Sequence, residues 1–245
     1  MKRFIIIAAS LLWGAALFAQ ELVIRIDDMG ALHSVNTASI DTYQNGIARS
    51  VEVLAVGAWF PEAVKMLKEN PGLDVGIHLA ITSEWENVKW RPLTDCPTLV
   101  DENGYFFPMM GPNPAYPGQS VMENASKFDI KEIEKEFRAQ IELALKNIPQ
   151  ITHISGHMLS TAYSPEVNAL VQKLSKEYNL PSVDRFDAFE QYDFEYVGYD
   201  GPKATAEEKL ASFIKMLDKL EEGKRYMFVD HPAYNDSEMQ TVMHV

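Results

Sequence analysis

The sequence has little cysteine, little positive charge and no long apolar run beyond its first residues. Cys96 is the only cysteine, so no internal disulfide can form, and we expect this side chain to be structural. Lys and Arg number 22 against 35 Asp and Glu, which gives a formal net charge of −13. This acidity argues against nucleic acid as a partner. Internal repeats and low-complexity tracts are also absent, and the length suits a single domain with one core.

The longest apolar run lies at residues 4–18, directly after a lysine and an arginine. It is shorter than the about 20 residues needed to span a membrane. A basic start, a short apolar segment and Ala19 at its end are typical of a secretory signal peptide. We therefore expect residues 1–19 to be a signal peptide, and residues 20–245 to form a secreted or periplasmic domain with no stable membrane span. An uncleaved anchor is the alternative.

Strand and helix patterns alternate along the rest of the chain. Apolar and alternating runs predict strands at residues 22–28, 47–56, 74–82, 151–158, 181–185 and 226–230. Helical spacing predicts helices at residues 34–45, with Ser34 as N-cap, and at 60–69, 129–147, 165–178 and 204–221. The order implies parallel strands joined by right-handed crossovers. We therefore expect an α/β fold, a (β/α) TIM-like barrel that is distorted or incomplete because it has fewer than eight strands.

Acidic and imidazole side chains stand near the ends of several predicted strands. Asp27 and Asp28 end the first strand and His78 lies late in the third. His157 ends the fourth strand, and His231 follows the last. In parallel barrels the loops after the strands converge on one mouth, where the active site lies. These five side chains are therefore predicted to meet at one site.

The residue types at this site suit a metal-dependent hydrolase. One carboxylate and two imidazoles, from Asp28, His78 and His157, form a common ligand set for a single divalent ion, Mg or Zn. Asp27 is adjacent to a ligand and can act as general base, while His231 could protonate a leaving amine. Taken alone, such an acidic pair before a helix is more often a helix cap with a solvated neighbour.

Other notable side chains have structural or functional explanations. We interpret His153 as a hydrogen-bonded core residue, and His33 and His244 as surface residues. Residues 83–127 have no helical period, and so long an irregular segment is predicted to be a functional loop. Its Trp85 and Trp90 are either platforms for a sugar ring or aromatic packing within the loop.

Seven short motifs resemble one protein family in both content and order. They are I-D-D-M-G at 26–30, V-G-I-H-L at 75–79, W-R-P-L at 90–93, L-V-D-E-N-G-Y-F-F at 99–107, F-R-A-Q-I at 137–141, T-H-I-S-G-H at 152–157 and H-P-A-Y at 231–234. From about Leu22 onward the chain resembles the YdjC-type carbohydrate deacetylases, also called the chitooligosaccharide deacetylase family.

The resemblance implies a fold, a site and a reaction. It implies a distorted (β/α) barrel that holds one divalent metal, Mg or Zn, through Asp28, His78 and His157. It also implies Asp27 as base and His231 as a candidate acid. The implied reaction is hydrolysis of the N-acetyl group of an amino sugar or short oligosaccharide, which releases acetate. Alternatives are metal-dependent hydrolysis of another amide or ester, and a degenerate, non-catalytic barrel that binds glycan through residues 83–127.

The chain departs from the family pattern at several positions. Arg25 and Ile26 stand where asparagine and alanine are usual, and Met29 where phenylalanine is common. Ser155 occupies the place of an aspartate and Leu159 that of a second histidine, changes expected to weaken metal binding. The sequence also ends soon after H-P-A-Y, so we expect the domain to lack the last family elements. An oligomer in which a second subunit covers an exposed edge is one alternative to a monomer.

Overall fold

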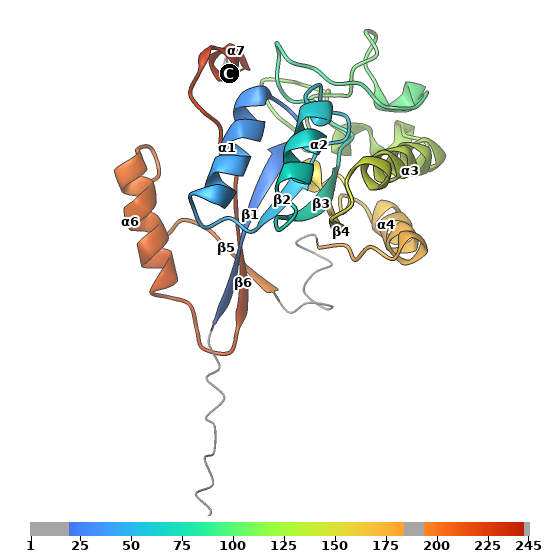
Figure 1. Ribbon diagram of the computed structural model, residues 1–245. Helices are drawn as coiled ribbons and strands as arrows, with labels where there is room; N and C mark the ends of the chain where they lie inside the picture. The colour runs from blue at the N-terminus through green and yellow to red at the C-terminus, as the bar shows by residue number, and fades with distance from the viewer. Residues whose placement is uncertain (1–19, 184–193, 243–245) are drawn as a thin grey trace, which may run out of the picture.

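The computed structural model describes residues 20–183 and 194–242 (Figure 1). The predicted signal peptide at residues 1–19, the end of the predicted strand at 181–185, and His244 lie outside the described residues. The strands are β1 (Glu21–Met29), β2 (Ser50–Val53), β3 (Asp74–Leu79), β4 (Ile151–Gly156), β5 (Phe194–Val197) and β6 (Arg225–Asp230). The helices are α1 (His33–Gln44), α2 (Phe60–Glu69), α3 (Ile130–Asn147), α4 (Pro165–Tyr178), α6 (Ala206–Leu217) and α7 (Ser237–Val242).

The strands form one parallel sheet in the order β4-β3-β2-β1-β6-β5. The sheet curls so that its two edges approach each other. The Tyr196 hydroxyl on β5 donates a 2.9 Å hydrogen bond to the carbonyl of Val183, which lies after β4 and α4 in the sequence. Helices lie outside the strands (Figure 1). The architecture is the predicted α/β fold, a curled partial barrel of six parallel strands.

The observed strands differ from the predicted ones in several places. Among the described residues, the predicted strand at 181–185 is reduced to an isolated parallel bridge between Ser182 and Ile154. The sixth strand is instead β5, which the sequence analysis missed, since four residues are too few to establish an alternating pattern. β2 is also shorter than the predicted strand at 47–56, because residues after Val53 turn away toward α2.

Side-chain caps begin some of the described helices but not α1. Asp129 accepts a hydrogen bond from Lys131 N at the start of α3, and Thr205 forms a capping box with Glu208 at the start of α6. The prediction that Ser34 caps α1 was wrong, because the helix begins at His33 and Ser34 is fully buried within its first turn. The Ser34 backbone N–H instead donates to the Glu238 carboxylate of α7, 2.9 Å away. The distant helix α7, which had not been predicted, thus supplies an acceptor for this helix terminus.

The two faces of the sheet have opposite character. Apolar side chains fill the space between the sheet and its helices, as on α3, where Ile133, Phe137 and Ile141 are buried. The concave face carries charged side chains instead, among them Arg25 and Glu52, both buried. The strand alternation that places Ile24 and Ile26 against the helices turns Arg25 and Asp27 inward. The barrel interior is therefore polar.

The long loop and α7 lie beyond the C-terminal ends of the strands (Figure 1). Residues 83–127 contain short 3-10 helices at Pro97–Leu99 and Met122–Lys127, and isolated bridges that join Val100 to Phe106 and Met109 to Ser120. The buried Glu136 carboxylate of α3 anchors this loop by accepting hydrogen bonds from the backbone N–H groups of Leu93 and Thr94. Within residues 20–183 and 194–242, no helix combines the length and apolar content needed to cross a membrane.

Candidate metal centre

A break in regular strand geometry brings two neighbouring carboxylates to the same site. The pairing of β1 with β2 shifts register between Ile26 and Met29, and Asp28 has a φ of +72°. In a regular strand Asp27 and Asp28 would point to opposite faces. With this irregularity, Asp27 Oδ2 lies 3.7 Å and Asp28 Oδ1 lies 3.5 Å from the same atom, His78 Nε2.

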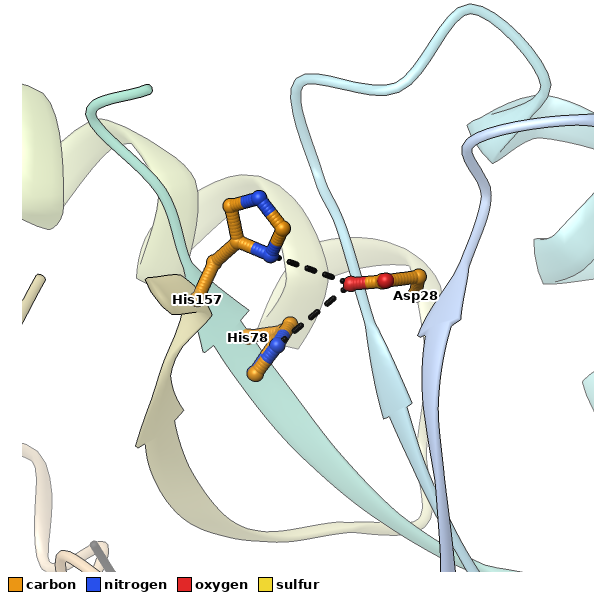
Figure 2. Close-up of side chains that lie close together, drawn as sticks. All are labelled: Asp28, His78 and His157. Carbon is orange, nitrogen blue, oxygen red and sulfur yellow. Dashed lines mark hydrogen bonds and ion pairs between the residues drawn. The ribbon is translucent and has the colours of Figure 1, made fainter. Parts of the chain in front are cut away.

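Asp28, His78 and His157 converge as the sequence predicts (Figure 2). Asp28 Oδ1 lies 3.5 Å from His78 Nε2 and 3.1 Å from His157 Nδ1. One ligand atom from each residue lies within 4.8 Å of the others, and all of these side chains are buried. A carboxylate oxygen with two imidazole nitrogens is a donor set that suits Zn, and with added water it also suits Mg. The residues therefore fit one divalent ion.

Each candidate ligand histidine has a hydrogen-bond partner on the ring nitrogen that faces away from Asp28. His78 Nδ1 lies 2.7 Å from Ser155 Oγ. His157 Nε2 lies 3.0 Å from Glu84 Oε2. Such partners fix the ring orientation and the tautomer of a metal ligand. The other two ring nitrogens, Nε2 of His78 and Nδ1 of His157, both face Asp28.

The charges at the site stabilise the ionised form of Asp28. Burial opposes its ionisation, but His157, His78 and His231 together hold the pKa of this carboxyl well below its usual range. Burial also disfavours charge on His157, yet Glu84 and Asp28 raise its pKa well above 6.5. Burial lowers the pKa of His78 in spite of Asp27 and Asp28. A cation bound here would replace the proton of His157, so binding is expected to release a proton.

Asp27 is held by a residue that departs from the family pattern. Arg25 Nε and Nη2 donate hydrogen bonds of 2.8 and 2.9 Å to the two oxygens of Asp27. Both side chains are buried, and this fork-to-carboxylate geometry fixes the direction of the acid. Arg25 therefore orients Asp27 beside the ligand set, a role that the sequence analysis missed.

His231 reaches the edge of the site. Its Nε2 lies 3.8 Å from Asp28 Oδ2, and 59% of its side chain is exposed. It follows β6 directly, and its backbone N–H donates to the Asp230 carboxylate at 2.9 Å. The structure thus brings His231 to the predicted place, on the solvent side of the ligand set.

A cavity of about 570 Å³ opens onto these residues. Its lining includes Trp85, Asn113 and Tyr116 from the long loop, and Met239 from α7. Trp90 has a different role, since it is buried and its Nε1–H donates a 2.6 Å hydrogen bond to the Thr82 carbonyl. Of the two tryptophans, Trp85 is therefore placed to contact a ligand, and Trp90 packs the loop.

His153, His33 and Leu159 have no part in the candidate metal centre. His153 is buried with its Nε2 2.5 Å from Glu52 Oε1, which confirms it as a hydrogen-bonded interior residue. His33 is exposed beside Glu62, as expected of a surface residue. Leu159 is 41% exposed and does not line the cavity.

Sequence reasoning missed Glu84 and Glu52. Glu84 lies five residues beyond the end of β3, in a loop with no periodic signal. Glu52 was visible as a polar residue within an apolar strand, and strand alternation could have placed it on the concave face. Its partners could not be foreseen, because they depend on the register between neighbouring strands.

Fold and site together describe a parallel α/β partial barrel with a candidate centre for one divalent ion at its mouth. Residues 21–244 match the family model described as YdjC-like protein, and the chain belongs to this family.

The chain is similar to curated proteins along most of its length. It is 29% identical over 218 residues to a carbohydrate deacetylase from Geobacillus stearothermophilus, covering 87% of this chain and 80% of the relative. It is 28% identical over 233 residues to a carbohydrate deacetylase from Thermoanaerobacter pseudethanolicus, covering 90% and 84%. A solved structure from Enterococcus faecalis V583, named as a cellobiose-phosphate cleavage protein, superimposes with a TM-score of 0.72 at 24% identity, covering 92% of this chain and 86% of that one. That likeness supports the fold alone.

Proposed function

We propose that this protein hydrolyses the N-acetyl group of an amino sugar or short oligosaccharide and releases acetate. The observation that carries the proposal is the convergence of Asp28, His78 and His157 beside Asp27, in the lining of an open cavity. The relatives named carbohydrate deacetylases support the choice of reaction and of substrate class.

One divalent ion, Mg or Zn, is the proposed cofactor. Asp28, His78 and His157 would hold it through the carboxylate oxygen and the ring nitrogens that face one another. When bound, such an ion supplies polarisation of the acetyl carbonyl and a lowered pKa of the attacking water. The ligand types favour Zn, whereas the family resemblance allows either ion.

Asp27 is the proposed general base. Its carboxylate lies beside the ligand set without being a member of it, 3.7 Å from His78 Nε2 at the nearest oxygen. Arg25 keeps it oriented through two hydrogen bonds. Asp27 would accept the proton of the attacking water as the bond to the acetyl carbon forms.

His231 is the proposed general acid. Cleavage of the amide C–N bond leaves an amine that must gain a proton, and a partly exposed imidazole close to Asp28 can donate it. With 59% of its side chain exposed, His231 lies on the solvent side of the site, where the leaving amine would depart.

The cavity suits a sugar ligand. Its volume of about 570 Å³ lies within the range usual for small-molecule sites. Trp85 and Tyr116 offer aromatic faces for a sugar ring, and the Asn113 amide offers a donor and an acceptor for hydroxyl groups. We further propose that the protein acts outside the cytoplasm, on the basis of the signal-like residues 1–19.

The test is acetate release from N-acetylglucosamine oligomers by the purified chain, after chelation and resupply with Zn²⁺ or Mg²⁺. We expect no acetate from the stripped chain and acetate after resupply. Simple acetyl esters are assayed in parallel. Acetate release from these esters alone would indicate the alternative, an ester hydrolase. A folded chain that binds the oligomers equally well with and without metal, and releases no acetate, would be a glycan-binding barrel and would contradict the proposal.

A further inference from the structure

A chain of buried polar side chains runs beneath the candidate metal centre, inside the barrel. His78 Nδ1 lies 2.7 Å from Ser155 Oγ, and Ser155 Oγ donates a close hydrogen bond to Glu52 Oε2. The other oxygen of Glu52 lies 2.5 Å from His153 Nε2 and 3.8 Å from Arg25 Nε. Ser155 and Glu52 are fully buried. No solvent is therefore available to replace these partners.

Strand register explains why the serine stands between the acid and the histidine. Ser155 of β4 is the direct partner of His78 on β3, whereas Glu52 of β2 pairs one layer lower, with Gly76. The carboxylate crosses from β2 to β4 over Gly76, where an added Cβ would collide with both Glu52 and His153. The absence of a side chain at Gly76 is thus what allows Glu52 to reach Ser155.

The number of available protons determines which group donates and which accepts in each hydrogen bond of this network. Burial opposes ionisation of Glu52, but His153 and Arg25 hold its pKa below the usual range, so its oxygens only accept. The single hydroxyl proton of Ser155 is therefore given to Glu52. Ser155 Oγ can then only accept from His78, which puts the ring proton on Nδ1 and leaves a lone pair on Nε2. Nε2 is the atom that faces Asp28.

We infer that Ser155 and Glu52 are positioning residues, a two-residue relay by which a carboxylate on β2 orients and polarises the ligand His78. The inference rests on the proposed metal site. In the relay, Glu52 fixes the Ser155 hydroxyl and Ser155 fixes the tautomer of His78. His153 and Arg25 neutralise the buried charge that this arrangement requires.

The experiment measures Zn²⁺ affinity of the chelator-stripped chain by competition with a chromophoric chelator. Ser155→Ala should weaken Zn²⁺ binding by about 10- to 100-fold, as is usual when the partner of a ligand histidine is lost. Ser39→Ala is the matched control, because Ser39 is equally buried but donates to a helix carbonyl on α1. The double variant Ser155→Asp/Glu52→Gln, which moves the carboxylate directly against His78, should regain most of the lost affinity.

A second readout needs no variant and no metal. The ¹⁵N chemical shifts of the His78 ring in the stripped chain should show a proton on Nδ1. A ring without a proton on Nδ1 would overturn the relay. So would a Ser155→Ala chain that binds Zn²⁺ as tightly as the parent, or a double variant that stays as weak as Ser155→Ala.

The outcomes separate this inference from the proposed function. A parent chain that binds Zn²⁺ but releases no acetate contradicts the proposed deacetylation alone. A parent chain that binds no Zn²⁺ contradicts both the proposed metal site and the relay.

Discussion

The two candidate ligand histidines, His78 and His157, are supported in different ways by the regions around them. His78 is backed from inside the barrel by Ser155 and Glu52, which lie on neighbouring strands and are fully buried. His157 is backed by Glu84, a loop residue whose side chain is 21% exposed and lines the cavity. Sites built on strands are held more rigidly than sites built on loops. One half of the centre is thus fixed by the barrel, and the other half can respond to a ligand in the cavity.

The largest expected effect comes from Asp28, the residue that both histidines share. Asp28→Ala removes the only carboxylate of the ligand set and leaves the two imidazoles without their common partner. We expect loss of Zn²⁺ binding and of acetate release, measured by chelator competition and by acetate assay. Asp218→Ala, at an exposed helix end, serves as control. Full activity of Asp28→Ala would contradict the assignment of Asp28 as the ligand that both histidines share.

Asp27→Asn should cause a loss of activity nearly as large, but through kcat rather than through metal affinity. The amide keeps the shape of the side chain and cannot take a proton, so kcat should fall by about 10²- to 10⁴-fold, a typical range for a general base. Zn²⁺ affinity should change little, because Asp27 is not a member of the ligand set. A variant that keeps its kcat would rule out Asp27 as base.

Glu84→Gln tests the loop side directly. The glutamine carbonyl can still accept from His157 Nε2, so the loss of Zn²⁺ affinity should be about tenfold or less, at the low end of the usual range for partners of ligand histidines. We therefore expect a smaller loss than for Ser155→Ala. Glu86→Gln, an exposed acid in the same loop, is the control. A larger loss in Glu84→Gln would reverse the assignment of rigid and adaptable halves.

The smallest effect concerns stability and pH. Burial opposes charge on His153, but Glu52 raises its pKa above 6.5, so this pair stabilises the fold when His153 is protonated. That contribution is fully present below pH 6.5 and is lost as the pH rises through the raised pKa of the folded state. Urea unfolding of the stripped parent and of His153→Gln should therefore differ most at low pH and converge as the pH rises. A difference that grows with pH would contradict this pairing.

Sequence patterns predicted the parts of the site that depend on local order. Alternation and position on the strands sufficed to bring Asp28, His78 and His157 together, since parallel strands end at one mouth. Patterns could not predict the contacts that depend on register across the sheet or on long loops. Glu52, Glu84 and the contact of Glu238 with α1 all belong to this second kind.

The serine at position 155 illustrates the difference. From sequence, replacement of an acid by Ser155 implies a weakened partner for the ligand histidine. In the structure the hydroxyl keeps a 2.7 Å contact with His78 Nδ1 and is itself bonded to Glu52. The acid that backs His78 through Ser155 stands on β2, which a single sequence cannot reveal because the two positions lie 103 residues apart.

The most direct test of the central claim is a titration of activity with metal. Zn²⁺ is added stepwise to the chelator-stripped chain while acetate release from N-acetylglucosamine oligomers is followed. We expect activity to rise with added metal and to reach a plateau at one ion per chain, with no rise in Asp28→Ala. Acetate release that survives chelation, or that is the same in Asp28→Ala, would contradict a reaction that depends on the centre formed by Asp28, His78 and His157.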